Sequence, residues 1–148
     1  MDIRRVEAGE LDALLALYEH LHPNDQPLPE RRQVEAVWQA IMANPSHRCL
    51  GLYLDGQLVA SCSINLVANL TRGCRPFALI ENVVTHAGYR GCGCGQALLA
   101  HALGFAWEQG CYKVMLMTSS KDPATLRFYE AAGFDRHDKQ AFIAKPPL

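Results

Sequence analysis

Hydrophobic positions recur along this chain with two different periods, which predict helices in its first third and strands after it. In residues 10–21, and again in 29–45, apolar residues return every three or four positions, as on one face of a helix. Pro29 suits a first helical turn, and residues 3–6 form a short strand before both helices. The inward face of the first helix is expected to hold Leu11, Leu14, Leu15, Tyr18 and Leu21.

From residue 49 the pattern changes to extended runs typical of strands. Two such runs surround Asp55-Gly56, a dipeptide that tolerates the positive φ angles of a tight turn, so we predict an antiparallel hairpin. Residues 76–85 form a further strand, whose apolar sequence is interrupted by Glu81 and Asn82. Polar residues inside an apolar strand mark a first candidate for a functional position.

Helices and strands alternate in the last third of the chain, at residues 96–109, 111–118, 122–133 and 136–145. Gly110 and Gly133 stand where the two helices end, while Asp122 is the expected N-cap of the later helix and Pro123 its first turn. The residues expected in the core include Leu98, Leu99, Ala102, Leu103 and Ala106, together with Trp38 and Trp107. This order of elements predicts an α/β (α+β) fold around a mixed sheet.

The composition describes an ordinary globular protein. A chain of 148 residues fits one domain, here 1–148, that can bury a core without metals or disulfides. The net charge of −1 gives no electrostatic footprint for nucleic acid or an anionic membrane, and no run of about eighteen apolar residues could cross a bilayer. The first residues have no apolar signal core, so the six cysteines are expected to be reduced thiols in the cytoplasm.

Cys92 and Cys94 form a C-x-C pair that raises the question of a metal. No second pair at zinc-finger spacing and no H-x-x-x-H accompanies them, so we expect no metal. A cysteine-based redox or metal protein is a separate function class, and it would hold its metal at these two residues.

The residues between the strand at 76–85 and the long helix are rich in glycine: Gly91, Gly93 and Gly95. A glycine loop that opens a helix presents unpaired N–H groups and the positive end of the helix dipole, which attract a phosphate. A G-x-G-x-x-G fingerprint fails, because its third glycine would fall on Gln96 or Leu98, and a P-loop fails because the loop has no lysine. A tight turn without a ligand is the alternative.

The run from Arg90 to Gly95 resembles the R/Q-x-x-G-x-G/A signature of GNAT acyltransferases, and "TLRFYEAAGF" resembles that family's late helix. The resemblance covers the C-terminal half of the chain. Within the family, "IENVV" and "GCYKVML" are most similar to glucosamine-phosphate N-acetyltransferases. The resemblance implies a single-domain fold with a mixed, mostly antiparallel central sheet flanked by helices, and acetyl-CoA as the co-substrate.

The resemblance also implies where acetyl-CoA binds. The backbone of Val83, Val84 and Thr85 would pair with the pantetheine arm like an added strand, where the strand splays from "CYKVMLM". The pyrophosphate would take N–H groups from the loop, which comprises Arg90, Gly91, Cys92, Gly93, Cys94, Gly95 and Gln96. Asp122 stands where the family commonly has an asparagine that contacts the cofactor, so a carboxylate replaces that contact.

Two residues are expected to carry the chemistry. Tyr129 matches the family tyrosine that protonates the departing thiolate, with packing over the cofactor as the alternative. Glu81 is the candidate base, acting through water on the ammonium form of the substrate. It could instead pair with Arg72 or Arg75. His86 is another candidate base, and the other five histidines show no partner pattern.

The expected activity is acetyl-CoA-dependent acetylation of the primary amine of a small molecule, by direct attack on the thioester. The alternatives are a protein or peptide N-acetyltransferase and a CoA-binding sensor without catalysis. Sugar-phosphate specificity does not carry over, because Lys139 and Lys145 have no accompanying arginine near the chain end. Sheet edges and family habit favour a homodimer.

Overall fold

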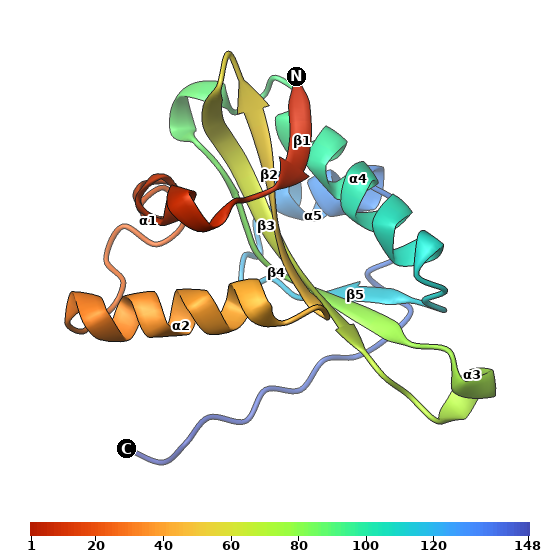
Figure 1. Ribbon diagram of the computed structural model, residues 1–148. Helices are drawn as coiled ribbons and strands as arrows, with labels where there is room; N and C mark the ends of the chain where they lie inside the picture. Colours follow the sequence, from red (N-terminus) through yellow and green to blue (C-terminus); the bar gives the residue numbers. More distant parts are fainter. The chain divides into compact units, whose positions relative to one another are not determined.

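The computed structural model describes residues 1–148, which form two compact units, Met1–Leu116 and Met117–Leu148. The first unit holds a five-stranded sheet whose strands follow chain order (Figure 1). The strands are β1 (Asp2–Arg5), β2 (His47–Leu54), β3 (Gln57–Val67), β4 (Phe77–Thr85) and β5 (Val114–Leu116). The helices of this unit are η1 (Ala8–Glu10), α1 (Leu11–Tyr18), α2 (Arg31–Ala43), α3 (Thr71–Cys74), η2 (Ala87–Tyr89) and α4 (Cys94–Glu108). The second unit holds α5 (Pro123–Ala131).

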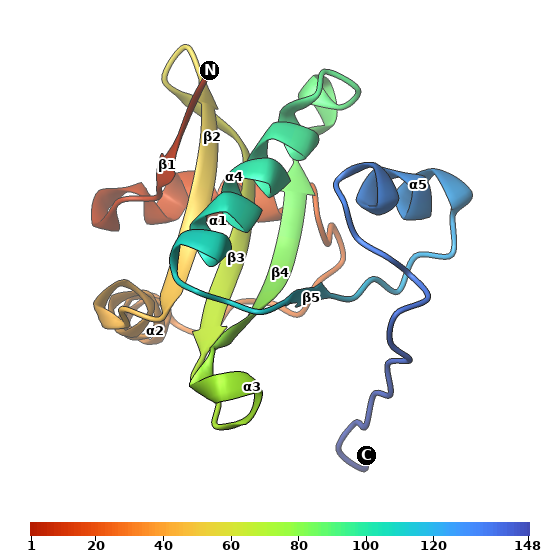
Figure 2. The same cartoon turned by 90° about the vertical axis from the view of Figure 1, so that its right-hand side faces the viewer.

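The sheet is mixed and mostly antiparallel. Strands β1 to β4 pair antiparallel with their neighbours, whereas β5 returns through α4 and pairs parallel to β4. Helices α1 and α2 lie on one face of the sheet, and α4 lies on the other (Figures 1 and 2). The predicted fold class is therefore confirmed.

The hairpin between β2 and β3 turns where the sequence predicts it. Asp55 and Gly56 have φ values of 50° and 79°, and both central positions of this two-residue turn are therefore left-handed. Such a turn matches the right-handed twist of the flanking strands, which accounts for the aspartate and glycine at this point.

The core fills both faces of the sheet. On the α1 face, Leu11 and Leu14 are buried as predicted, Leu17 joins them, and Trp38 packs into the same cluster. On the other face, α4 buries most of the residues expected of it, and Phe105 in addition: Leu98, Leu99, Ala102, Phe105 and Ala106. The expectation for Trp107 is wrong, because its side chain is 52% exposed on the outer side of α4.

A glycine ends α4 and a proline precedes α2, close to where the sequence predicts them. At the end of α4, Gly110 has φ 80°, and the N–H of Cys111 donates to the carbonyl of Ala106 at 3.0 Å, which closes the helix with a left-handed glycine. At the start of α2, Pro29 lies one residue before the N-cap Glu30 rather than in the first turn. Proline can hold either position, so the sequence alone does not separate them.

The predicted strand at 136–145 does not form. These residues adopt turns and irregular backbone, with Phe142 and Ile143 exposed, and Asp135 accepts a hydrogen bond from the N–H of His137. A strand is stable only when a neighbouring backbone completes its ladder, and no ladder in the structure includes these residues. Strand β5 is likewise shorter than expected and only half-buried.

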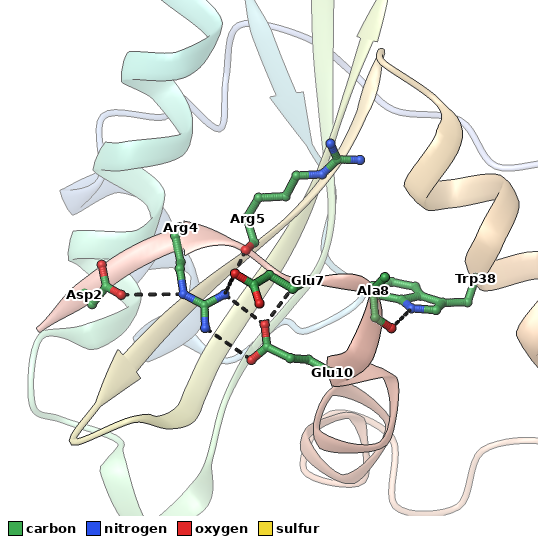
Figure 3. Close-up of polar contacts among 7 residues, drawn as sticks. All are labelled: Asp2, Arg4, Arg5, Glu7, Ala8, Glu10 and Trp38. Atoms are coloured by element: carbon green, nitrogen blue, oxygen red, sulfur yellow. Dashed lines mark hydrogen bonds and ion pairs between the residues drawn. The ribbon is translucent and has the colours of Figure 1, made fainter.

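A polar cluster fixes the junction between β1 and α1 (Figure 3). Arg4 donates to both carboxylate oxygens of Glu10, at 2.8 and 3.3 Å, and the N–H of Glu7 donates to the same carboxylate. Trp38 of α2 donates its indole N–H to the carbonyl of Ala8 at 2.8 Å. The start of α1 is thus tied to β1 and α2.

No helix in the structure is both long enough and apolar enough to cross a membrane.

Candidate functional site

Strand β4 carries a bulge beside the predicted polar interruption. Ser63 pairs with Glu81 and Ser61 with Val84, so two residues of β4, Asn82 and Val83, stand opposite a single residue of β3. Asn82 takes a left-handed φ of 54°. A bulge bends its strand and re-aims the side chains around it, and such features concentrate near functional sites.

One edge of β4 is unpaired beyond the bulge. The parallel ladder with β5 ends at the pair Ile80 and Leu116, while β4 continues to Thr85. Figure 2 shows β4 running on past β5 toward the N-terminal end of α4. The backbone of residues 81–85 can therefore accept an extended ligand along this edge as an additional strand.

Glu81 is exposed rather than buried in its strand. It forms no ion pair with Arg72 or Arg75, because Arg75 donates to the carbonyl of Arg72 and both guanidinium groups face the ring of Tyr112. The ion-pair alternative is thus wrong in this structure. The carboxylate is free to meet a substrate at the point where the sheet opens.

The glycine loop ends at an open helix N-terminus. Gly91 and Gly93 have φ values of 76° and 82°, which other residues rarely adopt. Gly93 is the N-cap of α4, so no side chain caps the helix, and the first turn holds no acidic residue. The helix ladder begins with the N–H of Ala97, which donates to the carbonyl of Gly93 at 3.1 Å. The positive end of the helix therefore has no anionic neighbour in its own first turn.

The polar side chains of the loop, those of Arg90 and Cys92, interact with backbone carbonyl groups of the protein. Arg90 donates to the carbonyl of Thr85 at 3.1 Å and to that of His20 at 2.9 Å, so its guanidinium is engaged within the protein. The thiol of Cys92 is exposed and lies 3.7 Å from the carbonyl oxygen of Arg90. Cys94 and Gly95 are buried in the first turn of α4. What the loop offers a ligand is mainly N–H groups.

His86 is a poor base in this arrangement. Its Nδ1 accepts a hydrogen bond from the N–H of Gly88 at 2.9 Å and thereby caps η2. A neutral imidazole then carries its proton on Nε2, which leaves no second lone pair for a substrate. The local capping role explains this histidine.

The other two predicted site residues belong to the second unit. Asp122 is the N-cap of α5, and its carboxylate accepts from the N–H of Ala124 at 3.0 Å, as predicted. Tyr129 is half-buried on α5, and its ring meets those of Phe128 and Phe134 edge to face, with centroids 5.0 and 6.4 Å away. Packing thus restricts the orientation of the tyrosine ring.

The structure adds polar groups near Glu81 that the sequence pattern does not indicate. Ser63 is buried opposite Glu81, and its hydroxyl lies 3.8 Å from the thiol of Cys49. Burial raises the pKa of Tyr18 to about 12, and a hydrogen bond with Ser63 offsets part of the shift. The sequence gives little reason to select Ser63 or Tyr18 as site residues, because Ser63 lies within an apolar strand and the pattern places Tyr18 in the core.

An open strand edge, a bulge with an exposed carboxylate and an uncapped helix after a glycine loop together suit a ligand with an amide arm and a phosphate group. No three or more His, Cys, Asp or Glu side chains are arranged to hold a metal ion. The chain belongs to the acetyltransferase (GNAT) family, whose model matches residues 11–134. It is an acyltransferase by family.

Two characterised proteins and one solved structure are similar to this chain over most of its length. The chain is 32% identical to glucosamine 6-phosphate N-acetyltransferase of Trypanosoma brucei brucei, over 95% of this chain and 92% of the relative. It is 30% identical to aminoglycoside N(6')-acetyltransferase type 1 of Serratia marcescens, over 91% and 92%. A structure described as an acetyltransferase from Agrobacterium tumefaciens matches with a TM-score of 0.91 and 39% identity, over 98% of this chain and all of that one.

Proposed function

We propose that this protein transfers the acetyl group of acetyl-CoA to the primary amine of a small molecule. The observation that carries the proposal is the continuity of two features: the unpaired edge of β4 leads, through the short turn that holds η2, into the glycine loop and the open N-terminus of α4. Residues Val83, Val84 and Thr85 would pair with the pantetheine amides. The N–H groups from Arg90 to Gln96 would bind the pyrophosphate.

The reaction is attack of a neutral amine on the thioester carbonyl carbon. Glu81, exposed at the bulge, would accept the proton of the substrate ammonium through a water molecule. A C–N bond forms, the C–S bond breaks, and a backbone N–H near Val83 or Val84 would stabilise the oxyanion. Tyr129 would then protonate the departing thiolate, since a phenol and a thiol hold their protons with similar affinity. The attacking nitrogen would lose its remaining extra proton to solvent as the amide forms.

A small molecule is the preferred acceptor, because the relatives named for their substrates act on an amino sugar phosphate and on aminoglycosides. Both kinds of substrate are sugars with primary amines. A protein or peptide N-terminus is the second acceptor class, and a CoA sensor is the alternative without catalysis. Asp122 is proposed as a cofactor contact at the N-terminus of α5, where its carboxylate also accepts a hydrogen bond from the N–H of Ala124.

The domain organisation, the compartment and the oligomeric state of the enzyme are also proposals. Residues 1–148 would act as one catalytic domain, since the family match runs from residue 11 to residue 134. Six free cysteines fit a reducing compartment such as the cytoplasm. The free outer edges of β1 and β5 support a homodimer, which light scattering would test.

The test is a mass-spectrometric acetylation assay with acetyl-CoA and a panel of amines: glucosamine 6-phosphate, glucosamine, aminoglycosides, polyamines, amino acids and short peptides. We expect an N-acetylated sugar amine, and a Tyr129→Phe variant that binds CoA normally but turns over about a hundredfold more slowly. Acetylation of peptides alone would replace the small-molecule acceptor. CoA binding without any product would favour the sensor.

A further inference from the structure

Two histidines far apart in the sequence stack beside the glycine loop, and the proposed reaction uses neither. His20 follows the C-cap of α1, and His86 follows the last residue of β4. Their ring centroids lie 4.0 Å apart with an interplanar angle of 36°. The ring of Tyr89 meets that of His86 edge to face, with the ring centroids 5.3 Å apart.

Both rings accept hydrogen bonds from the backbone of the same turn. The N–H of Ala87 donates to Nδ1 of His20 at 3.2 Å, and the N–H of Gly88 donates to Nδ1 of His86 at 2.9 Å. A nitrogen that accepts a hydrogen bond carries no proton, so each ring is neutral, with its proton on Nε2. Both imidazoles are therefore held in one tautomer.

His20 holds the turn at a second point. The guanidinium of Arg90 donates to the carbonyl of His20 at 2.9 Å and to that of Thr85 at 3.1 Å. The segment after α1 thus binds both ends of the turn that leads from β4 to Gly91. Gly88 fits under the His86 ring because it lacks a Cβ, which would lie 3.3 Å from two ring atoms.

We propose that His20 and His86 are positioning residues, which hold the turn Ala87–Arg90 so that the loop after it can bind the pyrophosphate of acetyl-CoA. The proposal rests on the function proposed above for this loop. Protonation at Nδ1 of either ring removes the acceptor of a backbone N–H, and two protonated rings 4.0 Å apart would repel each other. Loss of either acceptor should therefore loosen the turn and weaken cofactor binding.

Two further side chains contact the pair. Arg90 contacts the backbone of His20, and Tyr89 contacts the ring of His86. Glu19 and His22, one residue before and two residues after His20 in the chain, form no hydrogen bond, ion pair or ring contact with either ring.

Asparagine substitution tests the acceptor role, because the amide oxygen can take the place of Nδ1 as the acceptor of the backbone N–H. We expect His20→Asn to bind CoA with nearly the Kd of the wild-type protein at pH 8. His20→Ala should weaken CoA binding roughly three- to tenfold at pH 8, the effect of one lost hydrogen bond, with kcat at saturation unchanged. His101→Asn, which removes an exposed histidine of α4, is the matched control and should follow the wild type.

Nitrogen-15 NMR of the imidazoles without cofactor gives a readout independent of CoA. At pH 8 both rings should carry their proton on Nε2, and the amide signal of Ala87 should shift in His20→Ala. A proton on Nδ1 of either ring would overturn the pairing. Unchanged CoA affinity in His20→Ala would overturn the positioning role, whereas failure of the wild type to bind CoA at any pH would refute the proposed function of the loop.

Discussion

Ser63 and Glu81 lie directly opposite each other across β3 and β4, yet Ser63 is buried and Glu81 is exposed. Opposite residues of an antiparallel pair share one face of the sheet. The backbone bulges immediately after Glu81, where Asn82 takes its left-handed conformation. The carboxylate is thus exposed to solvent on the sheet face that α1 and α2 cover elsewhere.

Replacement of Glu81 by glutamine tests its role as the base. Glu81→Gln keeps the shape of the side chain but cannot accept the ammonium proton, so we expect kcat/KM to fall about a hundredfold or more. CoA affinity and melting temperature should stay unchanged, because the carboxylate has no partner in the protein. Glu108→Gln, at an exposed position of α4, is the control. Wild-type turnover in Glu81→Gln would exclude the carboxylate as the base.

Gly93 and Gly104 form a matched pair for testing the loop conformation. An added Cβ would meet nothing within 4 Å at either position, but Gly93 has φ +82° and Gly104 lies inside α4. Gly93→Ala should destabilise the protein by about 1–2 kcal/mol and weaken CoA binding, whereas Gly104→Ala should stabilise it by about 0.5–1 kcal/mol. Thermal unfolding and calorimetric titration of CoA measure both effects. Equal CoA affinity in the two variants would contradict the account.

The cysteines allow a footprint of the cofactor. Cys74 and Cys92 are exposed, while the other four are buried, and burial raises the pKa of Cys62 to about 12. Alkylation followed by peptide mass spectrometry should therefore label these two residues first. CoA should protect Cys92 in the glycine loop and leave Cys74 of α3 unaffected. Equal protection of both would place the cofactor elsewhere or indicate a general change in structure.

The Arg4–Glu10 pair predicts a response of stability to acid. The Arg4 guanidinium holds the pKa of the Glu10 carboxyl below its ordinary value. The pair therefore stabilises the folded state above the unfolded pKa of about 4.3, and this contribution is lost as the pH falls through the lower folded pKa. Glu10→Gln should melt at a lower temperature at pH 7 and lose less stability on acidification. An unchanged acid profile would contradict the role of this pair.

Local chemistry explains what the sequence predicts correctly. The Asp55-Gly56 turn, the Asp122 cap and the left-handed Gly110 all depend on a few neighbouring residues, so their positions can be inferred without the fold. The same holds for Gly93, whose conformation follows from the loop-to-helix junction. The glycine loop and the polar break in β4 could therefore be found in advance.

Long-range contacts account for what the sequence misses. The role of His20 cannot be recognised from the sequence, because its hydrogen-bond donor is a backbone N–H, that of Ala87, which lies 67 positions away. The strand predicted at 136–145 has a suitable pattern but no neighbouring strand. Trp107 fits a core residue by type, yet it falls on the outer side of α4. Each of these outcomes depends on the packing of distant segments.

The most direct measurement is a single-turnover reaction of the protein with acetyl-CoA that carries carbon-13 in its acetyl group, together with the best amine from the panel. Intact mass spectrometry follows the label on both the amine and the protein. Direct attack predicts that the label moves to the amine at the rate of turnover and never appears on the protein. Label on Cys92 before it reaches the amine, or CoA release without an acetylated amine, would contradict the account.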